Sequence, residues 1–264
     1  MLFSIITVVR NDRDGFQVTM ESVERQTFTE FEWIVVDGAS TDGTVDLIRS
    51  AERVSHWISE DDSGTYHAMN KGIAAAKGEY LVFLNAGDAF TNEDVLQLTS
   101  NLISSGNEPD IVFGGAYLMF PRGKHKYRGP RDFQRYVRHG LPAIHQATYY
   151  RRQTIEPNSY DLKYRICGDY YLVAMLSQKG VTAEYIDVPL VNFQVGGMST
   201  QSPARLLREC YVIQRDVLGI PIGLRVVSFT RRLINMLAVI ILYRAPVTWA
   251  FDKSSPRTGR LPRA

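Results

Sequence analysis

The chain has 264 residues, of which 45% are hydrophobic and 22% are charged. This composition supplies enough apolar side chains for a sizeable core, and it excludes a disordered chain, a collagen and a disulfide-stapled miniprotein. The formal net charge of +2 is unevenly distributed, since residues 1–204 carry 19 Lys and Arg against 25 Asp and Glu, whereas residues 205–264 carry 11 against 3. We therefore expect a main domain over 1–204 and a basic extension over 205–264.

The cysteines and the apolar segments indicate a cytoplasmic setting. Cys167 and Cys210 are the only cysteines, so neither a metal cluster nor a disulfide framework is predicted, and reduced thiols are expected. The first residues, Met1–Ile6, lack the basic flank and cleavage site of a signal peptide and predict a strand. The longest apolar run, Leu233–Tyr243, has 11 residues. A spanning helix needs roughly 20, so we expect no segment that crosses a bilayer.

The first hundred residues alternate between short β-branched runs and segments with helical periodicity. The predicted strands are Phe3–Val9, Trp33–Val36, His56–Ile58 and Tyr80–Leu84. The predicted helices are Phe16–Gln26, Val45–Ala51, Met69–Ala76 and Val95–Ile103. Continuous apolar strands separated by helices predict an α/β fold with a parallel sheet covered on both faces. Ligands bind such sheets at the carboxyl ends of the strands, so the polar turns there are the candidate site.

The second part of the chain is less regular. It has two apolar runs, Ile111–Gly115 and Tyr117–Phe120, and then a basic segment, Arg122–His139, which we expect to be a surface loop. A helix is predicted at Tyr170–Gln178, a strand at Ala183–Val188 and an irregular segment at Pro189–Ser202. Two further helices are predicted in the basic extension, at Leu206–Leu218 and Leu224–Tyr243. The extension is therefore expected to be helical.

Two carboxylates follow buried strands at the predicted edge. Asp37 ends the second strand, and Asp42 in the same turn is expected to cap the next helix. Asp88 closes the polar turn Asn85–Asp88 after the fourth strand. A carboxylate at Asp37 can accept hydrogen bonds from a nucleobase or a ribose, and one at Asp88 can help to hold a divalent ion that bridges phosphates. The alternative is that each is a turn residue without a ligand.

Five segments of the first ninety residues together resemble the family 2 glycosyltransferases. They are Asp37–Thr44, Ser59–Tyr66, Ala68–Gly72, Gly78–Tyr80 and Leu84–Asp88. The resemblance continues more loosely to Ser199, and the last 60 residues match no such pattern. It implies a GT-A fold, a Rossmann-like sheet with helices on both faces, with a nucleotide-sugar half over 1–120 and an acceptor half over 121–204. It also implies an inverting transferase that uses a nucleotide-sugar donor.

The resemblance implies a role for several residues on the donor side. Asp88 would bind Mg²⁺ or Mn²⁺ against the donor diphosphate. Many members of the family carry two consecutive acids where this chain has Asp37-Gly38 and Gly87-Asp88. Metal binding is therefore expected to be weaker, and the ribose contact has to come from other residues. The donor-binding residues are expected to be Thr7, Asp37, Asp62, Asn70, Lys71 and Gly87.

The resemblance also implies residues on the acceptor side. Gly168-Asp169 matches an acid at the start of a helix, so Asp169 would be the general base that takes the proton of the acceptor hydroxyl. In-line inversion needs this base opposite the leaving diphosphate. The alternative is that Asp169 only caps the helix. Residues expected near the acceptor or in a closing loop are His145, Gln146, Phe193 and Ser199.

The basic segments raise the question of partners. Arg231 and Arg232 precede the apolar run Leu233–Tyr243, a composition typical of a helix that lies in a membrane interface, although a helix packed on the domain is the alternative. We expect peripheral attachment to the inner face of the cytoplasmic membrane, where lipid-linked acceptors are found. The basic loop at 124–131 either binds an anionic acceptor or is simply solvated. No nucleic-acid motif accompanies it, so no nucleic-acid partner is expected.

The expected function is therefore transfer of a sugar to a hydroxyl of a glycan or lipid-linked acceptor, in cell-surface polysaccharide or glycolipid biosynthesis. A nucleotidyltransferase is one alternative, but it usually has a Gly-rich phosphate loop after the first strand, and Val8–Asp12 supplies none. The other alternative is a catalytically inactive transferase fold that binds membrane or nucleic acid through its basic tail. The sequence identifies neither the donor sugar nor the acceptor.

Overall fold

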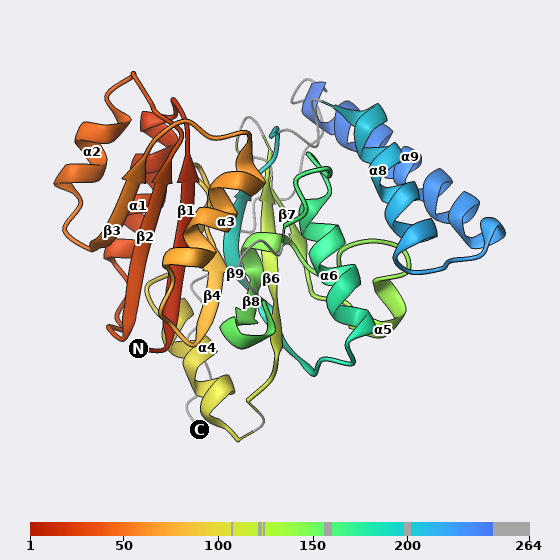
Figure 1. Cartoon of the computed structure of the whole chain (residues 1–264), viewed down its shortest axis with the longest axis horizontal. Coiled ribbons are helices and arrows are strands. Elements are labelled where there is room, and N and C mark those ends of the chain that lie inside the picture. The colour runs from red at the N-terminus through yellow and green to blue at the C-terminus, as the bar shows by residue number, and fades with distance from the viewer. Residues whose placement is uncertain (107, 121–122, 124, 156–159, 198–201, 245–264) are drawn as a thin grey trace.

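The computed structural model describes the whole chain except residues 107, 121–122, 124, 156–159, 198–201 and 245–264. Within this part, nine strands form one sheet with helices on both faces (Figure 1). The strands are β1 (Phe3–Val9), β2 (Phe31–Asp37), β3 (Val54–Ser59), β4 (Tyr80–Phe83), β5 (Ala89–Phe90), β6 (Ile111–Met119), β7 (His125–Arg128), β8 (Thr148–Arg151) and β9 (Ala183–Gln194). The α-helices are α1 (Arg13–Glu24), α2 (Thr44–Ser50), α3 (Thr65–Ala75), α4 (Val95–Ser104), α5 (Phe133–Tyr136), α6 (Gly168–Gln178), α8 (Pro203–Asp216) and α9 (Ile222–Arg244).

The strand order is β3-β2-β1-β4-β8-β6-β9-β5, with β7 paired to β6. The first four strands of this order are parallel, as predicted. Beyond β4, where no strand direction was predicted, the sheet is mixed, because β8 runs antiparallel to both of its neighbours. Since β8 lies between β4 and β6, the sheet continues without a break from the first half of the chain into the second.

Side chains of alternate residues on the central strands fill two cores, one on each face of the sheet. Ile6 and Val8 of β1 belong to the core that α3 and α6 cover. Ile5 and Val9 belong to the core that α1 and α4 cover. Every residue of β1 is buried, which explains the unbroken apolar run in its sequence. The carboxyl ends of the central strands are thus held from both sides.

Two predictions about irregular segments are wrong. The basic segment predicted to be a surface loop contains β7 and α5, and Arg128 in β7 donates a hydrogen bond to the Leu141 carbonyl oxygen. The segment from Pro189 onward continues β9 instead of becoming irregular. The register of β9 against β6 shifts at Pro189, opposite Gly115, and such an irregularity tolerates a residue without an N–H.

Both predicted helices of the C-terminal extension are present as α8 and α9. Cys210 and Ile213 of α8 are buried in the core that α6 also lines, so α8 packs as a part of the domain. The two helices lie side by side at one end of the molecule (Figure 1). None of the helices among the described residues combines the length and apolar character that a bilayer-spanning segment requires.

Candidate active site

Asp37 ends β2 with one carboxylate oxygen bound and the other unpaired. Its Oδ2 accepts hydrogen bonds from the Ser59 hydroxyl at 2.6 Å and from the Ser40 N–H at 3.0 Å. Its Oδ1 is shielded from solvent and has no hydrogen-bond partner among the described residues. Because an unpaired buried oxygen is costly, Oδ1 is a ready acceptor for an N–H or O–H of a ligand.

A second carboxylate, Asp62, lies against the same turn. Its Oδ1 accepts a hydrogen bond from the Gly64 N–H at 2.8 Å, which orders the loop that leads into α3. Its Oδ2 is so close to Gly38 that a Cβ added there would lie 2.7 Å from it. Only glycine allows this approach. The structure therefore brings Asp62 beside the residue that follows Asp37.

Asp88 closes the turn after β4 and exposes only 4% of its surface. Gly87 precedes it with a φ of +90°, a left-handed conformation that favours glycine. The Gln194 N–H donates to Asp88 Oδ1 at 2.9 Å, and the Gln146 side chain is a second hydrogen-bond partner of the carboxyl. Burial outweighs both bonds and raises the pKa of Asp88 to about 7. A cation beside this carboxyl would favour its charged form.

The turns that follow β2 and β4 meet at the end of β1. The Gly38 N–H donates to the Val9 carbonyl oxygen at 2.9 Å, and the Ala86 N–H donates to the Val8 carbonyl oxygen at 3.2 Å. Since β1 lies between β2 and β4, the two turns flank one strand end. This is the position at which open parallel sheets bind ligands.

Asp169 lies in the first turn of α6 and is partly exposed. Its Oδ1 accepts a hydrogen bond from the Tyr170 N–H at 2.7 Å. It accepts a longer one, at 3.3 Å, from the Tyr66 hydroxyl, which also donates to the Ile166 carbonyl oxygen at 2.8 Å. Burial raises the pKa of Asp169 to about 6, while these two bonds and the charge of Arg128 act in the opposite direction. A carboxyl with this pKa is ionised at neutral pH and is more basic than an ordinary aspartate. Asp169 can therefore accept a proton.

A buried aromatic cluster connects β8 with the start of α6. The His145 Nε2 lies 2.9 Å from the Tyr160 hydroxyl, and its Nδ1 lies 3.2 Å from the Tyr150 hydroxyl. The Tyr160 ring stacks on the Tyr66 ring with 5.1 Å between their centroids. Because Tyr66 hydrogen-bonds to Asp169, the cluster helps to hold the Asp169 carboxyl in position. No role was predicted from the sequence for these tyrosines, because Tyr66 lies in the segment Ser59–Tyr66 whereas Tyr150 and Tyr160 are far from it in the chain.

His145 belongs to this cluster and was expected to bind the acceptor. Its two ring nitrogens have protein partners, and burial lowers its pKa to about 3, so the imidazole is neutral. Both ring nitrogens of His145 are therefore occupied by tyrosine hydroxyls in this structure. Gln146 hydrogen-bonds to Asp88, and contact of either residue with the acceptor or the donor diphosphate stays a prediction. Phe193 is partly buried against the core of the α1 face, and Ser199 lies outside the described residues.

Three side chains expected to bind the donor hold the protein together. Thr7 is fully buried, and its hydroxyl donates to a backbone carbonyl after β4 at 2.7 Å. The Asn70 amide exchanges two hydrogen bonds with the backbone of Tyr160. Lys71 forms an ion pair with Glu60 at 2.8 Å in the loop before Asp62. In the structure these contacts give Thr7 and Asn70 a structural role and let Lys71 order that loop, and donor binding by the three residues stays a prediction.

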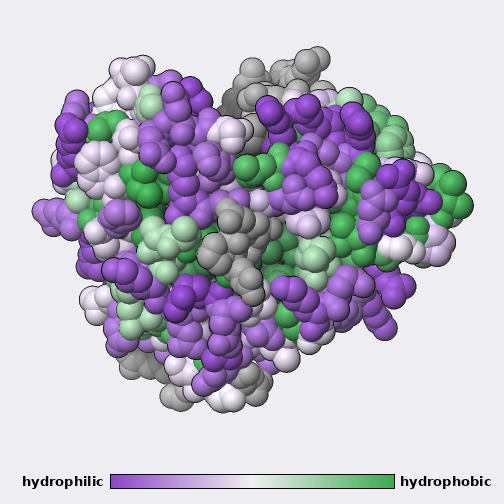
Figure 2. All heavy atoms as spheres, in the orientation of Figure 1, coloured by the Kyte–Doolittle hydropathy of each residue, from purple (hydrophilic) through white to green (hydrophobic). Residues whose placement is uncertain are grey.

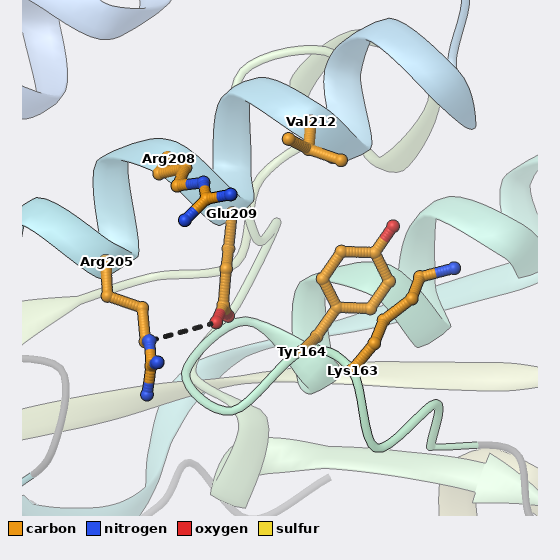
Figure 3. A pocket seen from close by; sticks show the side chains of 6 residues that line it. All are labelled: Lys163, Tyr164, Arg205, Arg208, Glu209 and Val212. Carbon is orange, nitrogen blue, oxygen red and sulfur yellow. Dashed lines mark ion pairs between the residues drawn. The ribbon is translucent and has the colours of Figure 1, made fainter.

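Glu209 of α8 fixes the segment that leads into α6. Its carboxylate accepts hydrogen bonds from the backbone N–H groups of Arg165, Ile166 and Cys167, at 3.1, 2.9 and 2.9 Å. These N–H groups lie at the amino end of α6, where backbone donors lack partners within the helix. Arg205 lies 3.9 Å from the same carboxylate, beside a cavity that Glu209 helps to line (Figure 3). The extension thus anchors the turn that carries Asp169.

We expect the Glu209→Ala variant to lower the free energy of unfolding by about 3 kcal/mol, because one buried and two part-buried N–H groups lose a charged acceptor. Urea denaturation of the purified protein measures this loss. The matched control is Glu21→Ala, which removes an exposed glutamate from α1 and should change stability by less than about 0.5 kcal/mol. Equal effects of the two substitutions would contradict the anchoring role of Glu209.

Comparison with known proteins identifies the family. The sequence profile of Glycosyl transferase family 2 matches residues 4–163. The chain is 28% identical over 260 residues to a PGL/p-HBAD biosynthesis glycosyltransferase of Mycobacterium bovis, covering 94% of this chain and 97% of the relative. It is 33% identical over 204 residues to an uncharacterized glycosyltransferase of Mycobacterium tuberculosis, covering 75% of this chain and 76% of the relative.

Solved structures share the fold. TarS 1-349 of S. aureus has a TM-score of 0.62 at 17% sequence identity, covering 92% of this chain and 73% of that chain. The mannosyltransferase PcManGT from Pyrobaculum calidifontis, solved with GDP-Man and Mn²⁺, has a TM-score of 0.65 at 15% identity, covering 91% of this chain and 74% of that chain. Since the family profile covers more than half of the sequence, the chain belongs to glycosyl transferase family 2 and is a glycosyltransferase with a GT-A fold.

Proposed function

We propose that the protein is an inverting glycosyltransferase that transfers a sugar from a nucleoside-diphosphate donor to a hydroxyl of a glycan or lipid-linked acceptor. The carrying observation is that Asp37 and Asp88 flank the end of β1 and that each carboxyl lacks a partner that a ligand could supply. Asp37 has an unpaired buried oxygen, and Asp88 has a pKa raised to about 7. Together the two carboxylates suit one polar ligand that offers hydrogen-bond donors to Asp37 and a metal-bound diphosphate to Asp88. Family membership argues against the nucleotidyltransferase alternative.

The donor nucleoside would bind at Asp37 and Asp62. Asp37 Oδ1 is available for an N–H of the base or a hydroxyl of the ribose, whereas Oδ2 is held by two protein donors. TarS has been solved in complex with UDP-GlcNAc and PcManGT with GDP-Man, so nucleotide sugars bind to proteins of this fold. Gly87, whose positive φ lets the backbone turn sharply before Asp88, would leave room for the phosphates.

A divalent cation fits the turn of Asp88. The Asn85 Oδ1 in this turn is buried without a hydrogen-bond partner among the described residues, and the Asp88 carboxyl is costly to ionise there without a counter-charge. Carboxylate and amide oxygens suit Mg²⁺ and Mn²⁺, which complete their shell with water and phosphate oxygens. No group of three His, Cys, Asp or Glu side chains that could hold a metal alone occurs among the described residues. When bound, the ion neutralises charge on the leaving diphosphate.

Asp169 would act as the base. The acceptor hydroxyl loses its proton to the Asp169 carboxylate while its oxygen attacks the sugar carbon, and the bond to the nucleoside diphosphate breaks on the opposite side. Asp169 is partly exposed, and Tyr66 and the Tyr170 N–H orient its carboxylate. One proton is transferred and one glycosidic bond replaces one glycosyl phosphate bond, so the configuration at the sugar carbon inverts.

The names of the relatives suggest the acceptor class. One is a PGL/p-HBAD biosynthesis glycosyltransferase, and another, 36% identical over 96 residues, is a putative teichuronic acid biosynthesis glycosyltransferase of Bacillus subtilis. Glycolipid and cell-surface polysaccharide precursors are the corresponding acceptors that we propose for this chain. With such acceptors, we propose that the enzyme works at the inner face of the cytoplasmic membrane.

Nucleotide binding tests this function directly. UDP, GDP, dTDP and CMP nucleotides are each added with and without Mn²⁺, and the melting temperature is measured, since a ligand that binds only the folded state raises it. We expect a metal-dependent rise with one nucleotide class. The Asp37→Asn variant should lose this rise, whereas Asp46→Asn, on the exposed surface of α2, should retain it. If no nucleotide changes the melting temperature, the donor site proposed here is wrong.

A further inference from the structure

Helix α9 turns its polar side toward the protein. The Ser228 side chain is buried, and its hydroxyl lies 2.7 Å from the His139 Nδ1. Arg232 donates to the His139 carbonyl oxygen at 2.7 Å, and Arg231 donates to the Tyr136 hydroxyl at 2.8 Å. An amphipathic helix on a domain surrounded by water has the opposite arrangement, with its apolar stripe against the core. Helix α9 therefore does not pack on the domain through an apolar stripe, as the packed-helix alternative would require.

The apolar side of α9 faces away from the protein. Val226, Val227, Ile234 and Leu237 expose 56%, 57%, 60% and 49% of their surfaces. Val226, Ile234 and Leu237 lie at helical spacing on the face opposite Ser228. Val226, Val227 and Ile234, together with Thr230 and Arg231, border an open hollow of about 400 Å³. Figure 2 shows hydrophobic spheres along the edge of the molecule where α8 and α9 lie in Figure 1. Such a contiguous exposed face indicates a partner.

The charges on this end of the molecule indicate which partner. Glu209 and Asp216 are the only acids in residues 205–244. Glu209 is buried and accepts hydrogen bonds from three backbone N–H groups, and Asp216 is paired with Arg215. Arg205 and Arg208 are exposed on α8 (Figure 3). Because α8 packs against α9, these arginines make this end of the molecule cationic, which attracts anionic lipid and opposes contact with a second copy carrying the same charges.

We propose that the outer face of α9, together with the exposed arginines of α8, is a docking surface for an anionic lipid bilayer. The helix lies in the plane of the interface with Val226, Ile234 and Leu237 among the acyl chains and the arginines beside the headgroups. It does not cross the bilayer. A lipid-linked acceptor would be reached from this surface, and to that extent the inference rests on the function proposed above. The docking itself stands on the orientation of α9 and on the positive charge of this end of the molecule.

Vesicle sedimentation of the full chain tests the docking surface. The vesicles contain either phosphatidylcholine alone or a mixture with phosphatidylglycerol, and neither nucleotide nor acceptor is present. We expect binding to the anionic vesicles and much less to the neutral ones. The double variant Val226→Glu/Ile234→Glu, at exposed positions of α9, should need roughly tenfold more anionic lipid or fail to bind. Its melting temperature should stay unchanged, because neither side chain is buried.

The matched control is Val18→Glu/Leu98→Glu, which places two charges at exposed apolar positions of α1 and α4 and should leave vesicle binding unchanged. Equal binding of the two double variants, or no binding by the unaltered chain, overturns the proposal. A dimer in light scattering that the α9 variant dissociates, without vesicle binding, overturns it in favour of a second copy. The α9 variant should still show the nucleotide-dependent rise in melting temperature, so failure of docking is distinguishable from failure of the proposed function.

Discussion

The Asp169→Asn variant is expected to fold normally and to lose about 10²- to 10⁴-fold in turnover, the range that a general base contributes. The asparagine oxygen can still accept the hydrogen bonds from Tyr66 and the Tyr170 N–H, so α6 keeps its first turn. What is lost is the group that takes the acceptor proton. Steady-state transfer from the donor that the melting panel identifies, to a soluble acceptor analogue, measures the effect.

A pH profile separates a base from a structural residue at this position. Because the pKa of Asp169 is about 6, the unaltered enzyme should lose activity tenfold per pH unit below about pH 6, as the carboxylate becomes protonated. The residual activity of Asp169→Asn should not show this loss below about pH 6. Asp14→Asn, which alters an exposed aspartate in the first turn of α1, is the matched control and should keep full activity. Retained turnover in Asp169→Asn would refute its role as the base.

The donor half of the fold could be predicted because its strands carry a strong local signal. β1 and β2 are buried on both faces and therefore appear as unbroken apolar runs. β8 has no such signal, since Thr148–Arg151 is only four residues long and contains two tyrosines. Its antiparallel pairing with β4 and β6 comes from contacts between distant segments, which no local pattern encodes. The parallel part was predictable, and the mixed part was not.

The site follows the same division. The positions of Asp37 and Asp88 at strand ends could be read from the chain, because polar turns follow apolar strands there. The bonds that occupy Asn70 and His145 could not be predicted, because their common partner, Tyr160, is remote in sequence from both α3 and the strand ends. A polar residue in a family motif can either hold the fold together or contact a ligand. Only the hydrogen bonds that it makes in the structure distinguish these two roles.

The Asp88→Asn variant should gain stability and lose function. The asparagine oxygen can still accept from the Gln194 N–H, and the Gln146 amide can reorient toward the new NH₂ group. The cost of ionising a buried carboxyl disappears. With a pKa raised from 3.8 to about 7, that cost is at most about 4 kcal/mol above pH 7. We therefore expect the melting temperature of the metal-free variant at pH 8 to rise by several degrees.

The pH dependence of this gain identifies its cause. Because the pKa of folded Asp88 is raised, ionisation destabilises the folded state increasingly from about pH 4 to pH 7, so the advantage of the variant should be complete at pH 8 and nearly absent at pH 4. In the same variant, the metal-dependent response to nucleotide should vanish and turnover should fall by about 100-fold or more. A variant with unchanged stability at both pH values would contradict the buried charge, and one with undiminished turnover would contradict the metal role of Asp88.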